Sequence, residues 1–129
     1  MSTNIPADLK YSKSDEWVRS EGDELVIGIT DFAQDALGDI VYLDLPKIGA
    51  QLVPGASFGV IESVKASSDL FAPVGGEVVA INTSLERDQA PVNSDPYGAG
   101  WLIRVRPNGA TEELLDAAAY ATYCAERAH

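Results

Sequence analysis

The sequence predicts a mostly β fold: a flattened barrel or sandwich of two antiparallel sheets, with a short internal helix and a C-terminal helix. Three observations lead to this prediction. Short apolar runs recur along the chain, and turns containing Gly or Pro separate them at short intervals. One short internal stretch and the C-terminal segment carry helical signals instead. No helix-length segment alternates with the strands, which argues against a parallel α/β sheet.

The composition is that of a single soluble domain. The 129 residues fit one domain, predicted to span 1–129, and the apolar (46%) and charged (22%) fractions are ordinary for a globular protein. Nine basic and 20 acidic residues give a net charge of -11, which argues against nucleic acid and membrane surfaces as partners. Because no signal peptide, transit peptide or membrane-spanning run is found, we expect a cytoplasmic, bacterial protein.

The first half of the chain is predicted to hold several strands around one short helix. Strands are expected at 9–11, 16–20, 24–29, 40–45 and 51–53. The second and third of these flank a Gly-Asp turn, which is typical of a β-hairpin. Thr30 can cap a helix over about 30–38, because an acidic residue follows in the first turn and Gly38 stands at the end.

The second half is predicted to hold further strands and a terminal helix. We expect a hairpin at about 57–73, a turn at 73–76, and strands at 77–82 and 101–106, the last ended by Pro107. The segment at about 111–127 is predicted to be helical, with caps at Thr111 and Asp116. Its packing face is expected to consist of small residues: Ala117, Ala121, Cys124 and Ala125.

Lys65 lies at the tip of the predicted 57–73 hairpin. Apolar residues precede and follow it, and small residues around it allow the chain to turn. A lysine at such a tip has no core to enter, so its charged head stands in water on a rigid pair of strands. A protein that displays a lysine for another protein to modify would place it in this way.

Other chemistry is hard to build from this sequence. His129 is the single histidine and Cys124 the single cysteine, which argues against a protein-ligated zinc site and excludes an intramolecular disulfide and a CxxC redox pair. A Ser–Lys dyad or a Schiff-base lysine would need a buried lysine, and a hairpin tip gives the opposite environment. Gly75-Gly76 lacks the surroundings of a phosphate-binding loop. We therefore expect no catalytic residue and no metal site.

Two acidic residues bracket Lys65 in the sequence. Glu62 lies three residues before it and Asp69 four residues after it. In a hairpin both can lie close to the lysine without contacting it. From the residues alone, the simplest interpretation is charge balance for one exposed lysine.

Several blocks of the chain resemble the H protein of the glycine cleavage system. The run Glu62-Ser-Val-Lys-Ala66, followed by Ser68-Asp-Leu70, Ala72-Pro73 and Gly76-Glu-Val78, resembles its lipoylation hairpin. The blocks Gly28–Asp39 and Pro96-Tyr-Gly98 with Gly100-Trp-Leu-Ile103 distinguish it from other lipoyl domains. A biotin carrier would be expected to have Met on both sides of the lysine, where this chain has Val64 and Ala66. The resemblance covers nearly the whole chain.

The resemblance implies a cofactor and a set of site residues on a lipoyl-domain-like barrel-sandwich hybrid. (R)-lipoate would be attached covalently to Lys65 through an amide bond. The residues that match the recognition positions of the family's lysine hairpin are Glu62, Ser63, Val64, Ala66 and Asp69. The residues that match a surface cleft for the aminomethyl-loaded arm are Ser14, Glu16 and Asp69.

The resemblance also implies a function and partners. The chain would be a non-catalytic, monomeric shuttle of glycine catabolism and one-carbon metabolism. It would take an aminomethyl group from glycine decarboxylase (P protein) to the tetrahydrofolate-dependent aminomethyltransferase (T protein). Dihydrolipoamide dehydrogenase (L protein) would reoxidise the dithiol, and lipoyl-attaching enzymes would modify the lysine. Three alternatives remain open: an H-like lipoyl donor or relay for other lipoyl-dependent complexes, an unmodified adaptor domain, and a lysine-dependent enzyme.

The chain departs from the family pattern at a few positions. Asp15 stands where a His usually precedes Glu-Trp, which changes the charge expected at the cleft. Gly75 replaces a usual Ser, and the loop at 89–93 deviates. None of these positions is next to Lys65 in the sequence.

Overall fold

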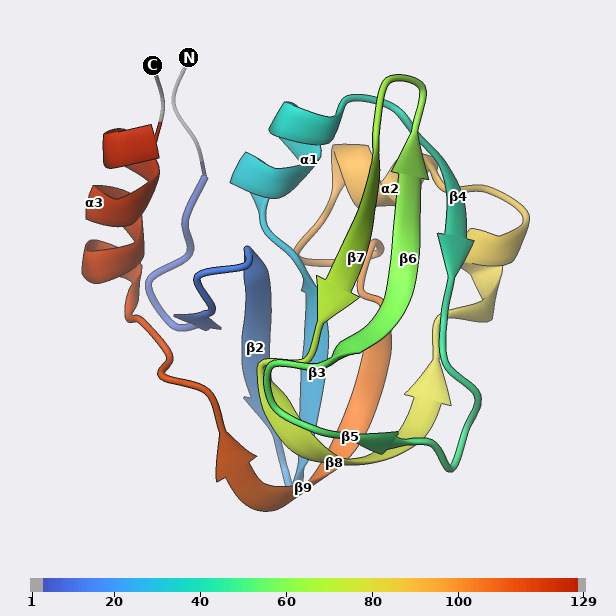
Figure 1. Cartoon of the computed structure of the whole chain (residues 1–129), viewed down its shortest axis with the longest axis vertical. Coiled ribbons are helices and arrows are strands. Elements are labelled where there is room, and N and C mark those ends of the chain that lie inside the picture. The colour runs from blue at the N-terminus through green and yellow to red at the C-terminus, as the bar shows by residue number, and fades with distance from the viewer. Residues whose placement is uncertain (1–3, 128–129) are drawn as a thin grey trace.

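Two antiparallel sheets form the domain (Figure 1). The computed structural model of the chain describes residues 4–127. The larger sheet has the strand order β1-β2-β3-β9-β8-β5, and the smaller has the order β4-β6-β7. The strands are β1 (Lys10–Tyr11), β2 (Glu16–Glu21), β3 (Glu24–Ile29), β4 (Ile40–Asp44), β5 (Gln51–Leu52), β6 (Ser57–Ser63), β7 (Ser67–Phe71), β8 (Val74–Ile81) and β9 (Ile103–Thr111). The predicted mostly β fold of two antiparallel sheets is confirmed.

Helices decorate the sheets at their ends and edges (Figure 1). They are α1 (Asp31–Leu37), a 3₁₀ helix (Thr83–Glu86), α2 (Ala90–Ser94) and α3 (Ala117–Arg127). The predicted internal helix is α1. The hydroxyl of Thr30 accepts a hydrogen bond of 3.2 Å from the backbone N–H of Ala33, and Gly38 ends the helix with φ 81°. The sequence signals at both ends of this helix are therefore confirmed.

The main core lies between the two sheets. Strands β3, β8 and β9 contribute buried Ile27, Val78 and Val105, and the smaller sheet contributes Ile61 and Leu70. Strand β3 is buried on both faces, since Ile27 packs in this core and Val26 in a second cluster. The burial fixes how the β6–β7 hairpin lies on the larger sheet.

A second apolar cluster joins α3 to the outer edge of the larger sheet. Its buried members include Trp17 and Val26 from the sheet and Tyr120 from α3. The rings of Tyr11 and Tyr120 stack with centroids 4.6 Å apart and an interplanar angle of 6°. The indole N–H of Trp17 donates a hydrogen bond of 3.0 Å to the carbonyl of Pro96. The C-terminal helix is thus part of the domain body.

The predicted ends of the last two strands are wrong. Strand β8 already begins at Val74, where a turn over 73–76 was expected, and β9 runs through Pro107 to Thr111. The register between the two strands shifts near Gly76, which stands opposite Pro107. A bulge of this kind accommodates a proline that cannot donate to the ladder. Local sequence signals do not reveal such a partner.

The predicted start of the C-terminal helix is also wrong, and its packing face is only partly as predicted. Residues 111–116 are not helical, because Tyr11 and Leu115 exchange backbone hydrogen bonds of 2.8 and 2.7 Å. The cap at Asp116 is correct, since its carboxylate accepts from the backbone N–H of Ala119 at 2.8 Å. Tyr120 and Cys124 are buried, whereas two of the expected small residues, Ala121 and Ala125, are exposed. The packing face therefore combines Tyr120 with the predicted Cys124 and Ala117.

Gly28 is expected to tolerate no side chain. A Cβ atom there would lie 2.7 Å from three atoms of the buried Trp17 ring. We expect Gly28→Ala to lower the free energy of unfolding by about 1–3 kcal/mol, because neither group has room to move. Gly22→Asn is the control, since nothing lies within 4 Å and asparagine tolerates its φ of 64°. Urea unfolding measures both; equal stabilities for the two variants would contradict the clash.

Candidate functional site

The tip of the β6–β7 hairpin is held by one serine. The hydroxyl of Ser63 accepts hydrogen bonds from the backbone N–H of Lys65 (3.3 Å) and of Ala66 (3.0 Å). The backbone N–H of Ser63 donates to the carbonyl of Ala66 at 2.8 Å. The backbone N–H of Val64 donates to the carbonyl of Asp39 at 3.0 Å and ties the tip to the segment after α1. Lys65 is exposed, as predicted, on a fixed turn.

The side chain of Lys65 lies along the end of α1. A Cβ atom added to Gly38 would stand 3.4 Å from Cε of Lys65 and 3.9 Å from its Cδ. Within residues 4–127, no carboxylate oxygen lies within 4.0 Å of the lysine ammonium group, so neither Glu62 nor Asp69 pairs with it. The lysine stem therefore points toward the side of the hairpin that faces α1.

A cleft of about 180 Å³ lies between α1, the hairpin and the turn before β2. One side of its wall is apolar and comes from β3, α1 and the inner face of the hairpin. The other part is polar and acidic. The lining residues are Ser14, Asp15, Glu16, Ile29, Ala33, Ala36, Leu37, Ile61, Ser68, Asp69 and Leu70. The structure thus brings together the three cleft residues predicted from the sequence, placing Asp69 of β7 beside the sequence neighbours Ser14 and Glu16.

Glu16 is the buried acid of this cleft, with 1% of its surface exposed. Its Oε1 accepts hydrogen bonds from the hydroxyls of Ser12 (2.7 Å) and Ser14 (2.5 Å). Its Oε2 accepts from the backbone N–H of Phe71 at 3.2 Å. Burial raises the pKa of Glu16 to about 7, although the three hydrogen bonds oppose this shift. The carboxyl group can therefore change its charge near neutral pH.

Sequence reasoning missed Ser12, Phe71 and Gly38. Ser12 is buried and also closes the turn before β2, because its hydroxyl accepts from the backbone N–H of Glu16 at 3.0 Å. A serine a few residues before a strand is a weak signal for such a turn. Phe71 acts through its backbone N–H, so its side-chain type carries no signal, and Gly38 in the sequence indicates only the end of a helix.

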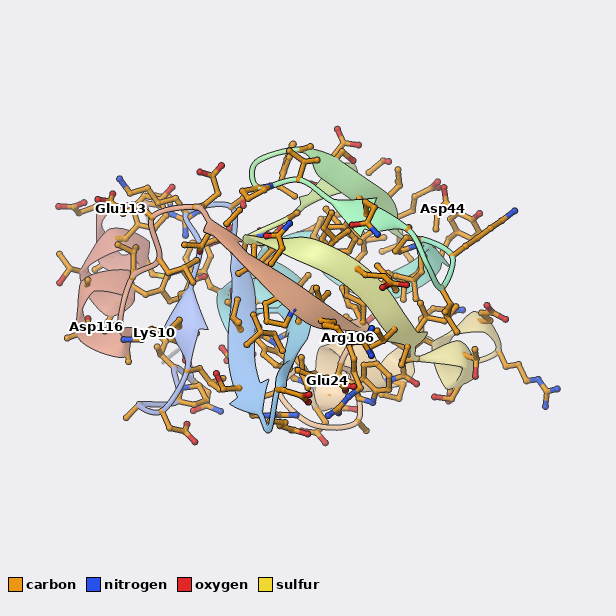
Figure 2. The ribbon with its side chains drawn as sticks, turned by 90° about the horizontal axis from the view of Figure 1, so that it is seen from below. Lys10, Glu24, Asp44, Arg106, Glu113 and Asp116 are labelled. Carbon is orange, nitrogen blue, oxygen red and sulfur yellow. The ribbon has the colours of Figure 1, made fainter. Side chains whose placement is uncertain are left out.

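A larger pocket of about 440 Å³ lies on the other side of Ser14. Its lining includes Lys13, Phe71, Glu112 and Glu113. Figure 2 shows Glu113 at the end of the molecule that carries α3. Lys65, Glu16 and Asp69 do not line this pocket. Volume alone therefore does not select the functional site, and the cleft with the buried acid is the stronger candidate.

Metal ligands, free thiols and long apolar helices are scarce in the described part of the chain. Within residues 4–127, no group of three or more His, Cys, Asp or Glu residues could hold a metal ion. His129, the single histidine, lies outside the described residues. Cys124 is buried in α3. Among the helices of the described part, none is long and apolar enough to cross a membrane.

Comparison with known proteins gives one consistent result. The family described as Glycine cleavage H-protein matches residues 9–127. The chain belongs to the glycine cleavage H-protein family. It is 52% identical over 126 residues to the glycine cleavage system H protein of Nitratidesulfovibrio vulgaris, which covers 98% of this chain and 99% of the relative. It is 55% identical over 125 residues to that of Mycobacterium avium, covering 92% of this chain and 95% of the relative.

A solved structure supports the same assignment. The crystal structure of a glycine cleavage system H protein from Mycobacterium marinum superimposes with a TM-score of 0.86 at 40% identity. The match covers 97% of this chain and all of that one. The family is the lipoyl-carrying shuttle of the glycine cleavage system, so the resemblance inferred from the sequence is confirmed.

The raised pKa of Glu16 predicts a pH-dependent stability. Between 4.5, its ordinary pKa, and about 7, the folded chain keeps a proton that the unfolded chain has released. The proton on Glu16 therefore stabilises the folded chain fully below pH 4.5. This contribution is lost as the pH rises to about 7, which lowers the free energy of unfolding by about 3 kcal/mol. Urea unfolding of wild type and Glu16→Gln across this range measures it, because the glutamine removes the titration. Glu86→Gln, an exposed control, should keep the wild-type slope. Parallel profiles for wild type and Glu16→Gln would contradict the prediction.

Proposed function

We propose that the chain carries lipoate in amide linkage on Lys65 and serves as the shuttle of the glycine cleavage system. The observation that supports this most directly is the placement of Lys65. It is exposed on a turn closed by Ser63, and its stem lies along Gly38 at the edge of the cleft that contains Glu16. A modifying enzyme can reach the amine, and the modified side chain starts beside the cleft.

The residues of the cleft fit a lipoyl arm. The apolar part of the wall, with Ala33, Leu37, Ile61 and Leu70, offers a surface for an aliphatic chain. No cysteine lines the cleft, so its own side chains offer no thiol. When attached, lipoate supplies the thiol–disulfide chemistry that the buried Cys124 does not provide.

The acidic part of the cleft fits an aminomethyl cargo. An amine is cationic at neutral pH, and Glu16 and Asp69 provide carboxylates on two sides of the same cavity. The hydroxyls of Ser12 and Ser14 orient the Glu16 carboxylate. A cation in the cleft would lower the pKa of Glu16 again and favour its charged form. The apolar wall limits the access of water, which slows hydrolytic loss of the cargo.

The chain itself acts as a carrier and the chemical steps belong to its partners. These are glycine decarboxylase, the tetrahydrofolate-dependent aminomethyltransferase, dihydrolipoamide dehydrogenase and the enzymes that attach lipoate. The net charge of -11 favours partners with basic docking faces. Glu62, Val64 and Ala66 surround Lys65 at the tip and are the residues that a lipoyl-attaching enzyme would meet first.

The attachment site can be tested by intact mass. Protein isolated from its own cells, grown with lipoate available, is expected to carry a lipoyl-sized mass increment that Lys65→Arg abolishes. Lys47→Arg is the matched control, because Lys47 is also exposed and lies outside the hairpin. An increment that survives in Lys65→Arg, or that is absent from the wild type, would exclude Lys65 as the carrier residue.

The cleft can be tested through the lifetime of the loaded arm. Glu16→Gln is expected to shorten it roughly tenfold, since a buried hydrogen bond to a charged group contributes about 1.5–3 kcal/mol. Asp69→Asn should have a smaller effect because Asp69 is exposed. Loaded protein is separated from the decarboxylase, and release of the one-carbon unit is followed over time.

Asp44→Asn is the control for the cleft variants. Asp44 is an exposed acid on β4, on the opposite side of the molecule from α3 (Figure 2). Unchanged lifetimes in both Glu16→Gln and Asp69→Asn would exclude the cleft as the cargo site. Transfer to the aminomethyltransferase in the reconstituted system would separate the shuttle from a lipoyl relay.

A further inference from the structure

Asp15 stands directly before Glu16 in an unusual backbone conformation. Its φ of 74° makes it the one non-glycine residue with positive φ among those the structure describes. Its backbone N–H donates to the carbonyl of Ser12 (3.1 Å), and its carbonyl accepts from the N–H of Thr30 (3.0 Å). Aspartate is one of the few non-glycine residues that adopt this region, and the two backbone hydrogen bonds hold Asp15 there. Because the two residues share a peptide bond, the orientation of Asp15 sets the direction in which Glu16 enters the cleft.

Arg127, in the last turn of α3, holds the Asp15 carboxylate in a forked contact. Its two terminal nitrogens donate to Oδ2 (3.0 Å) and Oδ1 (2.6 Å). The guanidinium carbon lies 4.3 Å from the ring centroid of Phe32 and 4.0 Å from that of Tyr123. The Nε of Arg127 is buried without a hydrogen-bond partner in the described chain. A lysine would reproduce the charge at this position but not the planar fork.

Tyr120 extends the contact from α3 to α1. Its hydroxyl donates to Oδ1 of Asp15 at 2.8 Å and shares a hydrogen bond of 2.6 Å with the hydroxyl of Thr30. Thr30 is the cap of α1, whose residues line the cleft. Figure 1 shows α3 and α1 at the same end of the molecule. The C-terminal helix thus contacts both the turn that carries Glu16 and the helix on the opposite wall.

The Asp15–Arg127 ion pair also determines the net charge next to Glu16. The carboxylate of Asp15 raises the pKa of Glu16, and its hydrogen bonds raise the pKa of the Arg127 guanidinium. Arg127 therefore compensates a negative charge next to the buried acid. The other charged groups near Glu16 are Asp69, across the cleft, and three beyond Ser14: Lys13, Glu112 and Glu113.

We propose that Asp15 and Arg127 are positioning residues, through which the docked C-terminal helix fixes the geometry and the electrostatic environment of Glu16. Asp15 lines the cleft, but its carboxylate is already paired with Arg127 and Tyr120. The effect on the loaded arm rests on the proposed function of the cleft. The effect on Glu16 itself is a property of the unmodified chain.

The test measures the titration of Glu16 in the unmodified protein and the lifetime of the loaded arm. Carboxyl ¹³C NMR of Arg127→Gln is expected to show a higher pKa for Glu16 than in wild type, since Asp15 is left uncompensated. Asp15→Asn is expected to show a lower one, since Arg127 is left uncompensated. Both should shorten the loaded-arm lifetime by at least about threefold, the coupling expected of residues in one network. Arg127→Lys should keep the pKa near wild type and recover only part of the lifetime.

Arg104→Gln is the matched control. Arg104 pairs with Glu21 and Glu24, and its side chain is 29% exposed against 30% for Arg127. Figure 2 shows Glu24 away from α3. It should change neither the Glu16 titration nor the lifetime, even if it lowers the melting temperature. Shifts of the Glu16 pKa in the same direction in Arg127→Gln and Asp15→Asn, or no shift in either, would overturn the proposal.

The loaded-arm lifetime separates this inference from the proposed function. A lifetime that falls in Glu16→Gln and stays at the wild-type value in Arg127→Gln and Asp15→Asn would overturn the positioning role alone. A lifetime that also stays at the wild-type value in Glu16→Gln and Asp69→Asn would overturn the cleft assignment. Opposite pKa shifts in Arg127→Gln and Asp15→Asn would still support the electrostatic coupling of α3 to Glu16 through Asp15.

Discussion

The buried carboxyl group of Glu16 is the constraint on which the site depends. Two hydroxyls and one backbone N–H hold it, and they come from the turn before β2 and from the end of β7. A buried acid costs several kcal/mol unless its oxygens find partners, so the turn and the hairpin must meet in one arrangement. The same contacts that satisfy Glu16 therefore join the two sheets at the cleft.

The hairpin holds the backbone around Lys65 in one conformation and leaves the lysine amine exposed. Ser63 closes the turn, and the hydrogen bond between Val64 and Asp39 attaches the tip to the segment after α1. The lysine stem lies against Gly38, where a side chain would crowd it. A lysine presented in this way loses little entropy when a partner recognises the backbone around it. Under the proposed function, the conformation of the tip serves recognition and the length of the side chain serves transfer.

The C-terminal helix has a role that its sequence pattern does not suggest. It buries Tyr120 and Cys124 and places Arg127 against Asp15, one residue from the buried acid. The family resemblance marked Asp15 as a departure from the usual pattern, and the structure supplies its partner in the last turn of α3. A change of charge at one end of the chain is therefore matched by a charge from the other end.

The sequence by itself determined the fold class, the helix capped by Thr30, the exposure of Lys65 and the family, because these depend on local patterns and on blocks of consecutive residues. Only the tertiary structure decided the strand through Pro107, the late start of α3 and the hydrogen-bond partners of Glu16. Each of these depends on a backbone group or side chain far along the chain, such as Gly76 opposite Pro107 or Leu115 beside Tyr11. Local propensity carries no information about which distant group will satisfy a hydrogen bond.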